Sequence, residues 1–137
     1  MTLQTGMMLL AAKMPLDMMI SKMSEGMVET LKIFFLTLLF SLPLGLVIAF
    51  GRMAKNRIIR YIVTVYIAIM RGTPLMLQVM AIYFGPNYLL HIRIPRSYRF
   101  IAIIVAFALN YAAYFAEIYR SGIESMPVGQ YEAAKVL

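Results

Sequence analysis

Four polar side chains stand out because each lies inside or beside a long apolar run: Arg71, Thr73, Asn110 and Glu117. A charged or amide group in such a run is costly to bury, and it often marks a path for a polar solute. Glycine and proline flank Thr73 and loosen the local helix, which would leave backbone groups facing a cavity. We therefore predict that these four residues line or brace a polar path, with Arg71 paired to Glu117.

Plainer interpretations of the same residues stay open at this point. Asn110 can hydrogen-bond to a neighbouring helix, and Glu117 can meet Arg120 or water near the end of its apolar run. The apolar segments on either side of Arg71 can also form a re-entrant hairpin, which would leave its guanidinium in water at the surface.

The residues that most catalytic sites need are scarce here. The chain has one histidine, His91, and no cysteine, whereas zinc sites and hydrolytic triads need several such groups at set spacings. No glycine-rich phosphate-binding loop is present either. We predict no catalytic residue, no metal site, no cofactor and no ATP hydrolysis by this chain itself. His91 is interpreted as a solvated loop residue.

The elements that must position these groups are those of a membrane protein. The composition is 62% hydrophobic and 14% charged, against about 45–50% and about 25% in soluble domains. The net charge of +7 comes mainly from basic residues between apolar runs, so we predict no nucleic-acid partner. The expected fold is an all-α polytopic membrane protein that contacts the lipid bilayer.

Three apolar segments have the length that a membrane span requires, at about 33–51, 61–84 and 100–119. A basic loop follows the first span and is expected in the cytoplasm by the positive-inside rule; it contains Arg52, Lys55, Arg57 and Arg60. The N-terminus then lies outside and the C-terminus in the cytoplasm. Residues 1–26 are expected to form an amphipathic surface helix or a poorly ordered tail.

The middle span is tolerable energetically although Arg71 lies at its centre. As one helix over 61–84 it would be about 36 Å long. Its apolar side chains contribute roughly −4.5 kcal/mol to insertion, and one central arginine costs roughly +2.5 to +3.5 kcal/mol. The turn-rich segment 85–99 should then be an external loop. Its three arginines suggest either an ordinary loop or a basic rim that contacts a binding protein.

Small residues mark the packing faces of the other two spans. Ser41, Gly45 and Ala49 are spaced by four, a pattern that lets helices approach closely. We expect this stripe to pack within the chain, the alternative being a face against a second subunit. In the third span a packing or cavity face collects small and polar residues within about 80° of the helix circumference: Ala102, Ala106, Asn110, Ala113 and Glu117.

The segment that follows the third span has a break and then a short helix, expected over about 127–137. Proline and glycine, Pro127 and Gly129, interrupt the chain, and residues of high helix propensity follow. This tail resembles the cytoplasmic Glu-Ala-Ala signature of ABC importer permeases, closest to those for polar amino acids. The residues that carry this resemblance are Ala113-Tyr114, Ala116-Glu117-Ile118, Arg120, Gly122-Ile123, Ser125, Pro127, Gly129-Gln130 and Glu132-Ala133-Ala134.

A second block resembles the same subfamily, Arg71-Gly72-Thr73-Pro74-Leu75 with Gln78 and Ile82-Tyr83-Phe84-Gly85. The resemblance covers about 27–137, where we expect a partial permease domain truncated within the Glu-Ala-Ala loop. It implies a bacterial inner-membrane permease subunit that couples to a separate ATPase. The implied coupling residues are Gly129, Gln130, Glu132, Ala133 and Ala134.

The implied partners are ABC ATPase subunits, a second permease subunit and an extracytoplasmic solute-binding protein. The implied substrates are polar amino acids. Three other functions stay open: a small membrane scaffold or binding protein, a membrane-embedded enzyme, and a permease fragment that does not transport.

Overall fold

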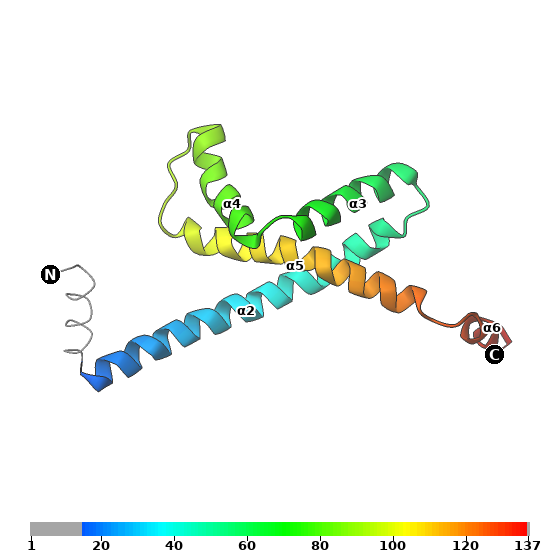
Figure 1. Ribbon diagram of the computed structural model, residues 1–137, viewed down its shortest axis with the longest axis horizontal. Coiled ribbons are helices and arrows are strands. Elements are labelled where there is room, and N and C mark those ends of the chain that lie inside the picture. The colour runs from blue at the N-terminus through cyan, green and yellow to red at the C-terminus, as the bar shows by residue number, and fades with distance from the viewer. Residues whose placement is uncertain (1–14, 137) are drawn as a thin grey trace. The chain divides into compact units, whose positions relative to one another are not determined.

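A computed structural model describes residues 15–136 of the chain, and these residues are almost entirely helical. The helices are α2 (Leu16–Arg52), α3 (Arg57–Gly72), α4 (Leu75–Leu90), α5 (Tyr98–Glu124) and α6 (Val128–Val136) (Figure 1). The predicted all-α fold is confirmed. By length and composition α2 and α5 can each cross a membrane, and α3 with α4 can do so as one bent pair.

The chain divides into two compact units, with the boundary between Phe34 and Phe35. In the first unit, residues 16–34 are helical and almost wholly exposed. An ion pair between Lys32 Nζ and Glu29 Oε1 (3.0 Å) lies on its surface. The N-terminal segment predicted over 1–26 is therefore helical from Leu16 on, and residues 1–14 of that prediction lie outside the described residues.

Helix α5 is the centre of the second unit, because α3 and α4 both pack against it (Figure 1). The tyrosine hydroxyl of Tyr66 on α3 donates to the carbonyl of Leu109 at 2.6 Å. Near the start of α5, Tyr98 Oη donates to the carbonyl of Ile82 on α4 at 3.2 Å. Helix α4 thus contacts the start of α5, and α3 contacts its middle.

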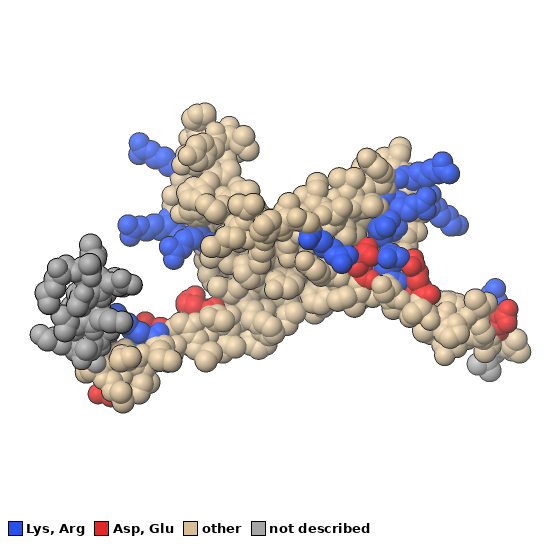
Figure 2. All heavy atoms as spheres, viewed as in Figure 1, with Lys and Arg blue, Asp and Glu red and all other residues tan. Residues whose placement is uncertain are grey.

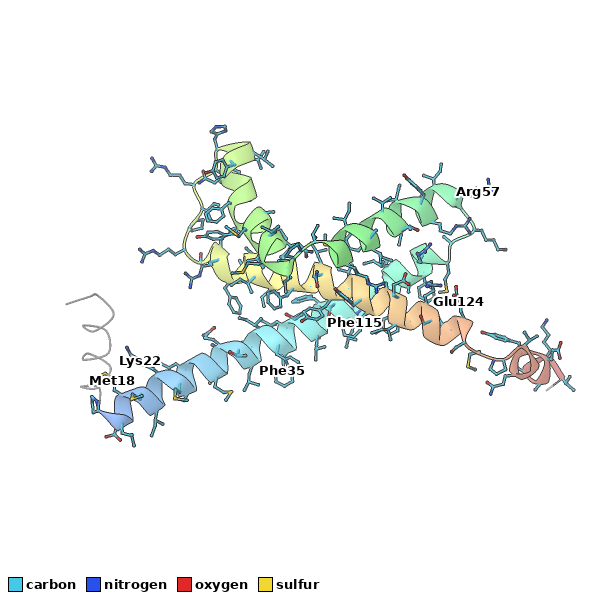
Figure 3. All side chains as sticks on the ribbon, viewed as in Figure 1. Met18, Lys22, Phe35, Arg57, Phe115 and Glu124 are labelled. Carbon is cyan, nitrogen blue, oxygen red and sulfur yellow. The ribbon has the colours of Figure 1, made fainter. Side chains whose placement is uncertain are left out.

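The small-residue stripe of α2 packs against α5. Ser41, Gly45 and Ala49 are all buried. A methyl group added at Gly45 would lie 2.7 Å from Phe115 Cβ and 3.2 Å from the carbonyl oxygen of Ala112. Figure 3 labels Phe115 where α5 crosses α2. The interpretation that this stripe packs within the chain is therefore the one that the structure supports.

The predicted single helix over 61–84 is wrong in one respect, because it is broken by a sharp bend. Helix α3 ends at Gly72, α4 begins at Leu75, and the two axes differ by 108°. Thr73 (φ −111°, ψ 144°) and Pro74 (φ −61°, ψ 134°) are both extended. The cause is local, since a proline disfavours helical geometry in the residue before it.

The predicted external loop over 85–99 is also shorter than expected. Helix α4 continues through Pro86 to Leu90, so that only residues 91–97 connect α4 to α5. Proline at this position removes one helical hydrogen bond, and the carbonyl that loses its donor, Ile82, accepts from Tyr98 Oη instead. The helix ends at His91, whose left-handed conformation (φ 52°, ψ 30°) is typical of a helix C-terminus.

Candidate functional site

The bend between α3 and α4 lies beside the middle of α5, and a cluster of amide hydrogen bonds joins the three helices there. Asn110 Nδ2 donates to the carbonyl of Met70 and to Gln78 Oε1, each at 3.0 Å. Gln78 Nε2 in turn lies 3.0 Å from the carbonyl of Met70, 3.2 Å from that of Thr73 and 2.8 Å from Thr73 Oγ1. Asn110 is buried, so both of its amide donors are used inside the protein.

An open pocket of about 480 Å³ lies on the α6 side of this bend, between α2, α3 and α5. Its charged lining residues are Arg52, Arg71 and Glu117. The rest of its lining is Thr64, Ile67, Ala68, Gly72 and Tyr114. Two cations and one anion around a partly apolar hollow suit a small polar solute or ordered water.

Glu117 does not pair with Arg71 as predicted. Its carboxylate accepts hydrogen bonds from Arg120 Nη2 (2.8 Å) and Nε (3.3 Å), and it lies 3.5 Å from Arg52 Nε. The Arg52 contact is an ion pair without hydrogen-bond geometry, because Arg52 Nε is buried with no hydrogen-bond acceptor among the described residues. The end of α2 lies against this part of α5. Arg52 is therefore within ion-pair distance of Glu117, whereas Arg71 is not.

Arg71 instead lies over an aromatic ring. Its guanidinium carbon is 5.4 Å from the centroid of the Tyr114 ring, within the range of a cation–π contact. Arg71 is otherwise exposed on the surface of the chain. Arg71 and Glu117 therefore share the pocket without touching, and the charge of Arg71 stays available inside it.

The charges near the pocket continue along α5 toward its C-terminus. Arg120 Nη1 also pairs with Glu124 Oε2 at 2.6 Å. The series Arg52, Glu117, Arg120 and Glu124 alternates in sign and joins the end of α2 to the last turns of α5. Figure 2 shows blue and red side chains gathered side by side near the α2–α3 connection, and Figure 3 labels Glu124 at the end of α5.

The structure thus divides the four predicted path residues into two groups. Thr73 and Asn110 take part in the cluster at the bend, and Arg71 and Glu117 line the pocket. Sequence reasoning missed three further contributors: Gln78, Arg52 and Tyr114. Gln78 carried the same signal as Asn110, an amide within an apolar run. Arg52 was assigned to a loop, and Tyr114 was noted only as part of the family resemblance.

Helix α6 carries the predicted coupling residues and is exposed throughout its described length. It begins at Val128 rather than at Pro127, whose carbonyl accepts from the Gln130 N–H at 3.0 Å. Gly129, Gln130, Glu132, Ala133 and Ala134 all lie within it. Its apolar side chains are uncovered as well, with Val128 71% and Tyr131 52% exposed. Such a helix is suited to contact another protein.

Within residues 15–136, no three His, Cys, Asp or Glu side chains lie close enough together to hold a metal ion. The arrangement offers hydrogen bonds, charge and a hollow.

Known proteins share this sequence and fold. A family model described as "Binding-protein-dependent transport system inner membrane component" matches residues 41–137. A putative glutamine transport system permease protein of Rickettsia prowazekii is 38% identical over 113 residues, covering 82% of this chain and 50% of the relative. An arginine transport system permease protein of Bacillus subtilis is 42% identical over the same length, with the same coverage.

A solved structure agrees with these relatives. It is described as an amino acid ABC transporter with histidines, and it matches with a TM-score of 0.75 and 35% identity over 90% of this chain and 57% of its own. The chain spans about half the length of the curated relatives it matches. The resemblance seen in the sequence is confirmed: this chain belongs to the family of binding-protein-dependent transport system inner membrane components.

Proposed function

We propose that this chain belongs to the transmembrane permease subunit of an ATP-driven importer for polar amino acids. The observation that carries the proposal is the exposed helix α6, which follows α5 directly and contains the Glu-Ala-Ala sequence. The names of the relatives, which concern glutamine and arginine transport, support the substrate class.

Helix α6 acts as the coupling helix. Its residues Gly129, Gln130, Glu132, Ala133 and Ala134 dock on a separate ATPase subunit, with the two alanines allowing close approach. Glu132 lies at the middle of α6 and is exposed, so its carboxylate is free to contact a partner. ATP binding changes the contacts of this helix, and only such a difference between two states can drive a conformational change.

The charged series at the end of α5 is the route by which movement of α6 reaches the pocket. Arg120 holds both Glu124 and Glu117, and Glu117 also pairs with Arg52 of α2. A displacement of α6 therefore acts on α5 and α2 together, and the pocket lies directly between them.

Arg71, Thr73, Asn110 and Glu117 belong to the translocation path in two ways. Arg71 and Glu117 present opposite charges to a solute in the pocket, as a zwitterionic amino acid requires. Thr73 and Asn110 shape the path by holding the bend. The complete transporter also contains a second permease subunit, two ATPase subunits and an external solute-binding protein.

Cross-linking tests the coupling proposal. Because the chain has no native cysteine, an introduced cysteine is its only thiol. Gln130→Cys, expressed in bacterial membranes with a photoactivatable thiol reagent, is expected to capture an ATPase subunit. ATP should change the yield. Asn87→Cys on α4 is the matched control, exposed but far along the chain from α6. Capture of no ATPase by Gln130→Cys, or equal capture by both variants, would refute the coupling role.

The proposed orientation places the N-terminus outside and α6 in the cytoplasm. It is supported by the basic residues around the α2–α3 connection and by the positive-inside rule. Lys135→Cys should resist a membrane-impermeant maleimide in intact cells and react after the membrane is opened. Labelling of Lys135→Cys in intact cells would contradict the proposed orientation.

A further inference from the structure

Two prolines of the broken span leave backbone carbonyls without their helical donors. A proline has no N–H, so the carbonyl four residues before it loses its hydrogen bond. Pro74 has this effect on Met70, and Pro86 has it on Ile82. In a lipid environment no water replaces the missing donor, and an unsatisfied carbonyl there is costly.

Side chains of α5 supply a donor to both carbonyls. Asn110 Nδ2 donates to Met70 at 3.0 Å, and Tyr98 Oη donates to Ile82 at 3.2 Å. Gln78 of α4 supports the first of these: it donates to Met70 and to the Thr73 carbonyl, and its own oxygen accepts from Asn110. The two donors on α5 therefore meet the two carbonyls that proline leaves open.

We infer that Asn110, Gln78 and Tyr98 are positioning residues, which hold the broken span on α5 by replacing the N–H groups that Pro74 and Pro86 lack. Pro74 starts the 108° bend locally, and Asn110 and Gln78 thereby hold it in place, with Arg71, the residue after Met70, at the edge of the pocket. The role of this bend in transport rests on the proposed function, whereas the hydrogen-bond replacement does not.

The bend can be measured directly with spin labels. Tyr61→Cys on α3 and Leu89→Cys on α4 introduce two labels at exposed positions. At 1.5 Å per residue, the labelled backbone positions are about 42 Å apart along a straight helix and about 25 Å apart across the 108° bend. We expect the chain in lipid nanodiscs to give one distance distribution near the shorter value.

Removing the donors should release the bend. Asn110→Ala is expected to broaden the distribution and to move a large fraction of molecules toward longer distances. Gln78→Met, which keeps the side-chain length at a less buried position, should do the same to a smaller extent. Asn87→Ala removes an exposed asparagine from α4 and should leave the distribution unchanged.

Restoring the backbone donor is the decisive step. Pro74→Ala returns an N–H to the carbonyl of Met70, so this variant should shift toward the longer distance by itself. Asn110→Ala should then add no further shift in the Pro74→Ala background. An unchanged distribution in both Asn110→Ala and Gln78→Met would overturn the inference. So would an Asn110→Ala shift of equal size with and without Pro74.

These outcomes are separate from those of the proposed function, because no ATPase and no substrate are present in the nanodiscs. Loss of the bend in the variants, together with failure of α6 to capture an ATPase, would leave the positioning role standing and remove the importer. If the bend persists in the variants while α6 captures an ATPase, the positioning role is removed and the importer stands.

Discussion

The crossing of α2 and α5 should be intolerant of even one added methyl group at Gly45. An alanine Cβ there would lie 2.7 Å from Phe115 Cβ, 3.2 Å from the Ala112 carbonyl oxygen and 3.4 Å from the Ala116 nitrogen. Carbon atoms pack best at about 3.5–4.0 Å, so the first contact is short by about 1 Å. All three atoms belong to the backbone or are attached directly to it, and no side-chain rotation can relieve the clash.

The expected result of Gly45→Ala is a less stable α2–α5 pair. Overpacking of this kind costs about 1–3 kcal/mol, and replacement of a helical glycine returns about 0.5–1 kcal/mol. The net loss should thus be roughly 0–2.5 kcal/mol in the free energy of unfolding, centred near 1 kcal/mol. Unfolding of the purified chain by sodium dodecyl sulfate in mixed micelles, followed by circular dichroism, measures this change.

Two other helical glycines provide matched controls for the same substitution. Gly26 lies on α2 and Gly85 on α4, and neither has an atom within 4 Å of an added Cβ. Gly26→Ala and Gly85→Ala should therefore leave stability unchanged or raise it by up to about 1 kcal/mol. The reasoning fails if Gly45→Ala proves as stable as these two variants, since that would mean α2 and α5 are not in contact at Gly45.

Two more substitutions test single interactions of the site, with the same unfolding assay. Tyr98→Phe leaves the Ile82 carbonyl without its donor and should cost about 1–3 kcal/mol; Pro86→Ala should suppress this loss, and equal losses in both backgrounds would contradict the donor replacement. Glu117→Gln removes the anion shared by two arginines at a side chain only 19% exposed, and it should destabilise more than Glu124→Gln. The latter removes a carboxylate that is 53% exposed, where ion pairs contribute about 0–1 kcal/mol; a larger loss at Glu124 would contradict this ranking.

Much of the candidate site could be identified from the sequence because the signal is local. Arg71, Asn110 and Glu117 each lie in or at the edge of an apolar run, and the cost of a polar group there depends on little beyond its neighbours in the chain. Gln78 satisfied the same criterion. The small-residue stripe of Ser41, Gly45 and Ala49 was equally local, because spacing by four places such residues on one helix face.

The partners of these residues could not be predicted in the same way. Glu117 was expected to meet Arg71, and it pairs with Arg52 and Arg120 instead. Periodicity says which residues share a face of one helix, but it does not say which helix that face meets or at what height. The position of Arg52 beside Glu117 depends on where α2 ends relative to α5.

By itself, the sequence determined that this chain is helical and apolar enough for a membrane, and to which family it belongs. Those properties follow from composition and from motifs contiguous in the chain. Only the tertiary structure decided that Asn110 and Tyr98 serve the carbonyls of Met70 and Ile82. The physical reason is that a hydrogen bond between helices depends on packing, which brings together residues far apart in the chain.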